Sequence, residues 1–368
     1  MRLFFYRNQK GCGEMRKRWY RRVLIMSLIL GCILGTGLCV SQLQEDLKRQ
    51  QVSAGDVTNN FVIPGGMPIG IYMETDGVLV LGTDSITGMD GQKYSPSENL
   101  VKAGDYILAI NGNEVVSKKE LLREISNLES ENVILKIRRE KENIDIKIKA
   151  AVTNKYEYKL GIWVRDSIQG LGTITFLTQD NEFGALGHGI HDSDTEDLLE
   201  IKKGQVYETR VVNIQKGVKG TPGGMEGVII YNRYNLLGTV EQNTECGVFG
   251  TINNVEALLE EEKAIPTCKK NEVKTGAATI RCCVTGEVKE YDIEIQKINR
   301  FSREENKGMV IKVVDEELLE ITGGIIQGMS GSPIIQDGKL IGAVTHVLVN
   351  DPTRGYGIFI ENMLEVAE

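Results

Sequence analysis

Chemistry that depends on an imidazole can use only three residues of this 368-residue sequence, because its histidines are His188, His191 and His346. Hydrolysis of an acyl bond by serine requires an exposed hydroxyl, an imidazole that takes up its proton, a group that orients the imidazole, and amides directed at the developing oxyanion. His188 follows a short apolar run and is flanked by Gly187 and Gly189. We therefore predict that His188, at a strand end, is the base, ahead of His191 and His346.

The candidate nucleophile lies in the glycine-rich stretch 328–333, which reads G-M-S-G-S-P. This stretch resembles the G-x-S-G-G-P nucleophile loop of chymotrypsin-like serine proteases, with Ser332 in place of the second glycine of the pair. The resemblance implies that Ser330 is the nucleophile and that the backbone amides of Gly328 and Ser330 form the oxyanion hole. The hairpin pattern over residues 334–344 is similar to the strands that leave this loop in that fold.

Other chemistries have weaker support in the sequence. His188 and His191 are three positions apart, whereas the two histidines of a zinc-protease helix are four apart, and Gly189 disfavours a helix between them. The sequence has no G-x-x-x-x-G-K-[ST] motif for phosphate, and Pro222 removes an amide from the glycine-rich stretch 217–224. We therefore expect neither a metal nor a cofactor.

The composition is that of a globular chain too long for one ordinary core, with 41% hydrophobic and 26% charged residues. Two folded units are expected. A net charge of -8 argues against a general nucleic-acid-binding protein. Four of the seven cysteines follow the first 50 residues, and we expect them to be half-buried small apolar side chains: Cys246, Cys268, Cys282 and Cys283.

The first 66 residues divide into three segments by charge. Residues 1–22 form a basic head with eight Lys or Arg and one Glu. Residues 23–43 carry no charge and are long enough to cross a bilayer, as a transmembrane helix or uncleaved signal anchor that leaves the head cytosolic and exports the rest. Small residues after the apolar run leave a cleaved signal peptide as the alternative. Residues 44–66 are polar, and we expect them to form a linker.

Residues 67–151 alternate apolar strands with turn residues and contain one predicted helix. It begins at Ser117, where Glu120 completes a capping box, and a hairpin is predicted around residues 138–143. The stretch G-D-Y-I-L-A-I-N-G at 104–112, followed by the capped helix, resembles a bacterial PDZ domain. The resemblance implies an x-Φ-G-Φ loop that binds the terminal carboxylate of a peptide, formed by Pro68, Ile69, Gly70 and Ile71.

Residues 152–368 change to short strands punctuated by glycine, which predicts an all-β domain. Helical periodicity is confined to residues 254–262 and 361–368. The chain is therefore predicted to be mainly β, with an N-terminal transmembrane helix and an α+β PDZ domain before a chymotrypsin-like double β-barrel.

The order of these parts, with A-L-G-H at 185–188 and Q-G-M-S-G-S-P at 327–333, resembles the stage IV sporulation protein B (SpoIVB) serine peptidases. The resemblance implies a catalytic triad of His188, Asp315 and Ser330. The residues alone leave the acid open. Asp315 lies 15 positions before the serine, far closer than the acid of chymotrypsin-like enzymes, and Asp192 and Asp194 directly follow the candidate base.

The resemblance also implies a function. It implies a signalling endopeptidase anchored in the forespore membrane, with its catalytic domain in the space between forespore and mother cell. Its implied substrates are a membrane-embedded regulator of an intramembrane protease that activates a sigma factor, and the peptidase itself. Two alternatives remain: a non-catalytic PDZ adaptor with a degenerate protease domain, and a general quality-control protease of the exported space.

Overall fold

Strands dominate the computed structural model, which describes residues 61–155, 157–253 and 263–367. This confirms the predicted mainly-β fold. The basic head, the predicted transmembrane segment 23–43, most of the linker and the helical pattern at 254–262 lie outside the described residues. Within the described ranges, no helix is long and apolar enough to cross a membrane.

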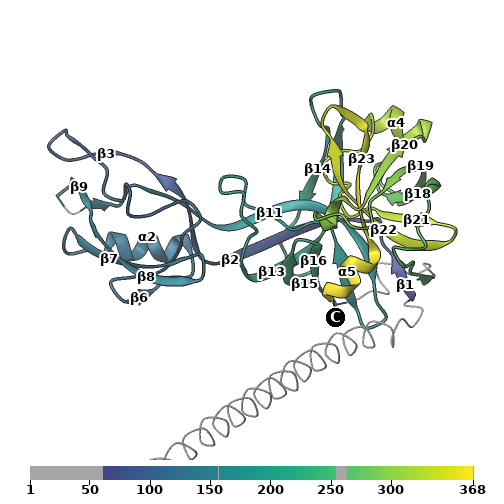
Figure 1. Ribbon diagram of the computed structural model, residues 1–368. Helices are drawn as coiled ribbons and strands as arrows, with labels where there is room; N and C mark the ends of the chain where they lie inside the picture. Colours follow the sequence, from purple (N-terminus) through teal and green to yellow (C-terminus); the bar gives the residue numbers. More distant parts are fainter. Residues whose placement is uncertain (1–60, 156, 254–262, 368) are drawn as a thin grey trace, which may run out of the picture. The chain divides into compact units, whose positions relative to one another are not determined.

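Six strands of the first half of the fold pair in a closed ring around an apolar interior, and two of them, β2 and β11, lie side by side in Figure 1. The order around the ring is β2-β11-β12-β16-β15-β13, and β13 pairs back onto β2. Ile69, Ile174 and Val248, each fully buried, belong to its core. The strands are β2 (Pro68–Thr83), β11 (Ile162–Leu177), β12 (Glu182–Ala185), β13 (Ile201–Gln215), β15 (Leu236–Thr244) and β16 (Gly247–Ile252). Three further strands flank the ring, namely β1 (Phe61–Pro64), β14 (Gly224–Ile229) and β17 (Ile265–Pro266).

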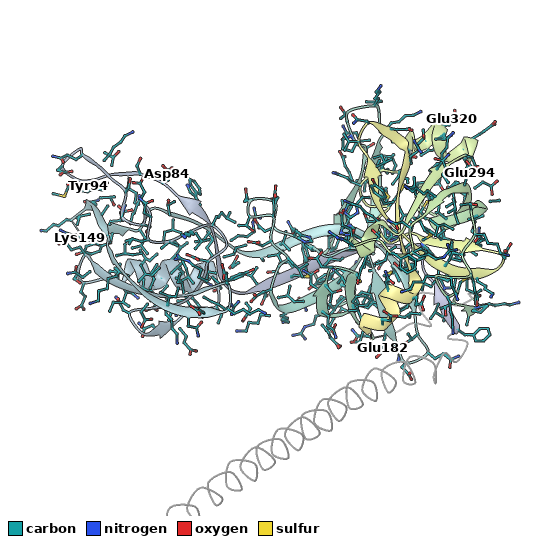
Figure 2. The ribbon with its side chains drawn as sticks, in the orientation of Figure 1. Asp84, Tyr94, Lys149, Glu182, Glu294 and Glu320 are labelled. Atoms are coloured by element: carbon teal, nitrogen blue, oxygen red, sulfur yellow. The ribbon has the colours of Figure 1, made fainter. Side chains whose placement is uncertain are left out.

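The second half forms a closed barrel with the order β18-β19-β20-β23-β22-β21, so both rings follow the same succession of first, second, third, sixth, fifth and fourth strand. In β19, buried Tyr291 and Ile293 alternate with exposed Asp292 and Glu294, which is the period of a strand with one face in the core. Figure 2 shows Glu294 at the outer rim of this barrel. Its strands are β18 (Gly276–Cys282), β19 (Lys289–Ile298), β20 (Met309–Val313), β21 (Pro333–Gln336), β22 (Lys339–Leu348) and β23 (Asp351–Phe359).

Two α-helices and one 3-10 helix accompany the second barrel. The predicted C-terminal helix is present as α5 (Ile360–Ala367), and the 3-10 helix η1 spans Glu305–Lys307. Helix α4 (Glu316–Thr322) was not expected from the sequence. It begins at the N-cap Asp315 and ends at Gly323, whose φ of 75° is the left-handed conformation typical of a helix C-terminus.

The segment that resembles a PDZ domain has an apolar cluster of its own, which includes Val78, Leu121 and Leu135. The predicted helix is confirmed: the amide of Glu120 donates to the Ser117 hydroxyl at 3.2 Å. The predicted hairpin is confirmed as β7 and β8. The elements of this segment are β3 (Ile86–Thr87), β4 (Lys93–Tyr94), β5 (Tyr106–Ile110), β6 (Asn113–Glu114), α2 (Lys118–Ser126), β7 (Asn132–Arg139), β8 (Glu142–Lys149), β9 (Ala151–Asn154) and β10 (Glu157–Lys159).

Two N-terminal expectations need correction. Residues 61–64, expected in the linker, form β1, which pairs with β11 and β17 because Val62 is buried. Pro68–Ile71, expected in a carboxylate-binding loop, lie inside β2 and pair with β11 on one edge, and all but Pro68 pair with β13 on the other. Pairing on both edges leaves this stretch no free edge for a peptide.

Candidate active site

One cavity of about 490 Å³ brings together the predicted base and nucleophile. His188 and Ser330, about 140 positions apart in the sequence, both line it. Gly328, His191 and His346 line the same cavity, so all three histidines of the chain meet here. Asp315 is not among the lining residues.

The two glycines beside His188 are required by close packing at the end of β12. Gly187 has a φ of 69°, and a Cβ there would lie 3.0 Å from Ile358 and 3.1 Å from Thr345 of the second barrel. At Gly189, a Cβ would lie 2.6 Å from the carbonyl oxygen of Thr244. The chain therefore bends at Gly187 and packs closely at Gly189, and the ring of His188 between them lines the cavity.

A backbone carbonyl orients the ring of His188. Its Nδ1 lies 2.8 Å from the carbonyl oxygen of Gly189. An Nδ1–H that donates to this oxygen leaves Nε2 unprotonated, which is the form a general base requires. Burial lowers the pKa of His188 below its ordinary value of 6.5, and His191 lowers it too, whereas the hydrogen bond to Gly189 and the charge of Glu245 oppose them.

We expect the acidic limb of the pH profile to lie below pH 6.5. The base must be neutral, and a lowered pKa keeps His188 neutral to a lower pH than a free imidazole, whose value is 6.5. The measurement is kcat/KM for peptide hydrolysis between pH 4 and 8. A limb with its midpoint at or above pH 6.5 would contradict the desolvated environment described for His188.

The nucleophile loop packs directly on the first ring. Gly331 has a φ of 93°, and a Cβ at this position would lie 2.1 Å from the carbonyl oxygen of Thr173 and 2.5 Å from the amide of Leu186. The carbonyl of Ser330 accepts a hydrogen bond from the Thr173 amide at 3.0 Å. The Ser330 hydroxyl donates to the carbonyl of Thr345 at 2.8 Å, so it must rotate toward His188 before it reacts. Catalytic hydrogen bonds commonly tighten only when substrate binds.

The amides of Gly328 and Ser330 are available for an oxyanion, since neither donates a hydrogen bond to any residue that the structure describes. Two threonines of β11 hold the loop in this shape. The Thr173 hydroxyl donates to the carbonyl of Gly328 and the Thr175 hydroxyl to that of Gly331, both at 2.8 Å. The sequence analysis missed both threonines. Their alternation with Ile174 and Phe176 indicates one face of a strand, but not that this face contacts a loop 155 residues away.

Replacing Thr173 with valine should reduce kcat by roughly 10- to 100-fold with little change in KM. Valine keeps the shape of threonine but leaves the half-buried Gly328 carbonyl without its donor, at a cost of about 1–3 kcal/mol near the oxyanion hole. Steady-state kinetics on a peptide substrate measures the effect. Thr173→Ser keeps the hydroxyl and should keep most of the activity; equal losses in both variants would argue against the hydrogen bond as the cause.

The other two histidines lie at the same cavity in different environments. The rings of His346 and His188 are in contact, with their centroids 4.8 Å apart and their planes tilted by 37°. Burial of the imidazole is the main cause that lowers the pKa of His346 to about 4, and the nearby His188 is the second, although part of the residue is exposed. His191 Nε2 lies 3.4 Å from Oε1 of Glu245, in the turn between β15 and β16. The sequence analysis did not single out Glu245.

The structure gives the three candidate acids other partners. Both carboxylate oxygens of Asp315 accept backbone amides, from Leu318 at 2.9 Å and Asp292 at 3.3 Å, because Asp315 caps helix α4. Asp192 and Asp194 form ion pairs with Arg165 of β11. No carboxylate among the described residues hydrogen-bonds His188, and the Gly189 carbonyl fills that position.

Asparagine at position 315 distinguishes a capping role from an orienting one. Asparagine caps helices about as well as aspartate, so we expect Asp315→Asn to retain activity within a few-fold. Asp315→Ala should lower the free energy of unfolding by about 1 kcal/mol. An orienting acid would behave differently, since its replacement by asparagine costs roughly 10⁴-fold in kcat in a Ser-His-Asp enzyme. Steady-state kinetics and urea unfolding of both variants measure the two effects.

The x-Φ-G-Φ pattern occurs a second time, at Lys159-Leu160-Gly161-Ile162. Its first three residues precede β11, and Ile162 is the first residue of that strand. Gly161 has a φ of 67°, as a tight turn requires. The first residues of β11 pair with β2 on one edge, and none of the described strands pairs with residues 162–166 on the other. The amide of Lys118, at the start of α2, donates to Asp166 at 2.8 Å, so this free edge and helix α2 are neighbours.

Comparison with known proteins gives the following similarities. The family model described as SpoIVB peptidase S55 matches residues 156–364. No curated protein matches the chain. The Rv3671c protease from M. tuberculosis, in its active form, aligns with a TM-score of 0.30 and 12% identity over 55% of this chain and 74% of that chain. An HtrA-type protease, AlgW, with a decapeptide aligns with a TM-score of 0.32 and 11% identity, over 81% of this chain and 61% of that one.

Proposed function

Because the chain belongs to the SpoIVB peptidase S55 family, and is therefore a serine peptidase, we propose that it is a membrane-tethered signalling endopeptidase with Ser330 as nucleophile and His188 as base. One observation carries the assignment of these residues. His188 and Ser330, distant in the sequence, line a single cavity beside two amides that donate to no described residue. The adaptor alternative, with a degenerate site, gives no reason for this arrangement.

The proposed mechanism uses groups of this chain alone. The Ser330 hydroxyl leaves the Thr345 carbonyl, donates its proton to Nε2 of His188 and attacks the peptide carbonyl. The amides of Gly328 and Ser330 stabilise the negative charge on the carbonyl oxygen. The protonated His188 then donates its proton to the leaving amine, and water, activated by the same imidazole, releases the acyl group. The Gly189 carbonyl accepts from Nδ1–H in both the neutral and the protonated ring and so keeps Nε2 directed at the reacting groups.

The proposed location and targets follow from the N-terminal sequence and from the family. The uncharged segment 23–43 behind a basic head supports an anchor with the catalytic part exported. We propose that the peptidase acts at the forespore membrane, where it cleaves itself and a membrane regulator of sigma-factor activation. A signalling role of this kind requires cleavage of few bonds, whereas a quality-control protease cuts unfolded proteins broadly.

The PDZ-like segment is proposed to bind a peptide at β11 rather than at Pro68–Ile71. The turn at Leu160-Gly161-Ile162 and the free edge of residues 162–166 support this proposal, because a peptide can add to a strand edge beside a helix. Binding measured by fluorescence polarisation should be stronger for peptides with a free C-terminal carboxylate than for the same peptides amidated. Equal binding of both forms would contradict a carboxylate-binding turn.

A serine-directed fluorophosphonate probe tests the proposed function on the full chain in detergent micelles. We expect stoichiometric labelling that maps to Ser330 by mass spectrometry. The buried thiols should not compete, since burial raises the pKa of Cys246 to about 12 and shifts that of Cys283 in the same direction. Absence of labelling, together with intact peptide binding, would support the adaptor. Extensive digestion of casein would support the quality-control protease.

A further inference from the structure

The wall of the active-site cavity contains no aspartate, glutamate, lysine or arginine among the described residues. Its ionisable members are the three histidines, and the two whose rings are in contact, His188 and His346, both have lowered pKa values that keep them neutral at pH 7. The cavity therefore offers no fixed countercharge to a substrate side chain. A charged side chain that entered it would lose its hydration without an ion-pair partner, which is strongly unfavourable.

The part of the wall that precedes the oxyanion hole begins with the exposed, uncharged side chain of Gln327 and continues with two apolar side chains that are firmly held. Ile325 and Ile326 come directly before Gln327 and Gly328 in the chain, and they are 2% and 1% exposed. The amide of Ile325 donates to the carbonyl of Pro352 at 2.8 Å, which fixes the loop to β23. These side chains form a fixed apolar part of the cavity lining, although little of their surface is open to solvent.

The loop that leads to the nucleophile has little conformational freedom to place a charged side chain in the cavity. Gly324 has a φ of 137°, and a Cβ there would lie 2.1 Å from the carbonyl oxygen of Pro352. A charged side chain at that position is therefore excluded by space as well as by backbone conformation. Val347, at the end of β22, contributes a further apolar surface to the cavity.

We propose that the substrate residue whose carbonyl Ser330 attacks carries an uncharged apolar side chain, of the size of valine, leucine, isoleucine or methionine, bound against Ile325, Ile326 and Val347. This inference rests on the proposed function and specifies the substrate class of the same site. The carbonyl of that residue must enter the hole formed by Gly328 and Ser330. The side chain of the same substrate residue then lies next to the loop that precedes the hole. Ile325 and Ile326 of that loop belong to the apolar part of the cavity wall.

A set of fluorogenic peptides that differ only at this residue tests the proposal. With the full chain in detergent, we expect kcat/KM for leucine or methionine to exceed that for aspartate or lysine by at least about 100-fold, as burial without compensation implies. Equal or better cleavage after aspartate or lysine would overturn the inference. It would leave the proposed function intact, because peptides would still be cut and Ser330 still labelled.

Val347 provides the matched variants, because it is partly exposed and so tolerates a charge better than the buried isoleucines. Val347→Glu should raise kcat/KM for the lysine peptide relative to the leucine peptide. Val347→Lys should raise kcat/KM for the aspartate peptide in the same way. Val347→Thr, which adds no charge, should leave the order of preference among the peptides unchanged. The rate of fluorophosphonate labelling shows that each variant is folded and active. If the variants are labelled but keep the wild-type order of preference among the peptides, Val347 does not contact the substrate side chain as proposed. Failure of the wild-type chain both to cut any peptide and to be labelled would instead contradict the proposed function.

Discussion

Replacing Ser330 with alanine should lower kcat for peptide hydrolysis by about a million-fold, the size of loss that follows removal of the nucleophile in a serine protease. The hydroxyl lines the cavity with His188, and alanine leaves the neighbouring amides in place. Binding of substrate should therefore change little. Active-site titration and steady-state kinetics on the full chain measure the loss, and labelling by a serine-directed probe should disappear.

The same loop contains a matched control, Ser332. This residue is fully buried, and its hydroxyl has no hydrogen-bond partner among the described residues. Its backbone accepts from Val344 and donates to Met329, and alanine preserves both bonds. Ser332→Ala should therefore retain nearly full activity. A large loss in Ser332→Ala, with activity kept in Ser330→Ala, would show that the nucleophile has been assigned to the wrong serine.

Replacing His188 with glutamine should cost about as much in kcat as the loss of the serine, because the two residues act as a unit. Glutamine preserves a polar side chain of similar length but cannot take up the proton of Ser330. The acidic limb of the pH profile should disappear with the histidine. Kinetics from pH 4 to 8 measure both effects.

His191→Gln and His346→Gln are the controls for this prediction, since they remove the other imidazoles at the cavity. His191 is exposed and pairs with Glu245, and the ring of His346 only contacts that of the candidate base, so we expect much smaller losses than in His188→Gln. Loss of all activity in His346→Gln, with activity retained in His188→Gln, would transfer the role of base to His346.

The base and the nucleophile could be predicted from the sequence because close packing imposes glycines beside them. A side chain at Gly189 or Gly331 would collide with a distant part of the chain, and Gly187 combines close contacts with a positive φ, so glycine is favoured at all three positions. The helix after Ser117 was equally predictable, because its cap and its apolar face are local patterns. Local requirements of this kind can be recognised in the sequence without knowledge of the fold.

The orienting group and the peptide-binding turn depend on contacts that local patterns do not contain. Asp315 precedes Glu316 and Glu317 and is followed by Gly323, a set of helix-end signals that fits an N-cap as well as a catalytic acid. The carbonyl of Gly189 could not be predicted as the partner of His188, since every residue has a carbonyl. Pro68–Ile71 fit a four-residue pattern, but the pairing of β2 with β11 and β13 depends on strands some 100 residues or more further along the chain.

The double variant His188→Gln/Ser330→Ala tests most directly whether these two residues act together at one cavity. If they form one catalytic unit, kcat/KM of the double variant should equal that of either single variant, because the second replacement removes nothing that the first has left. If the losses multiply, so that the double variant is slower than each single variant by the full factor of the other, the two residues act independently and the assigned site is wrong.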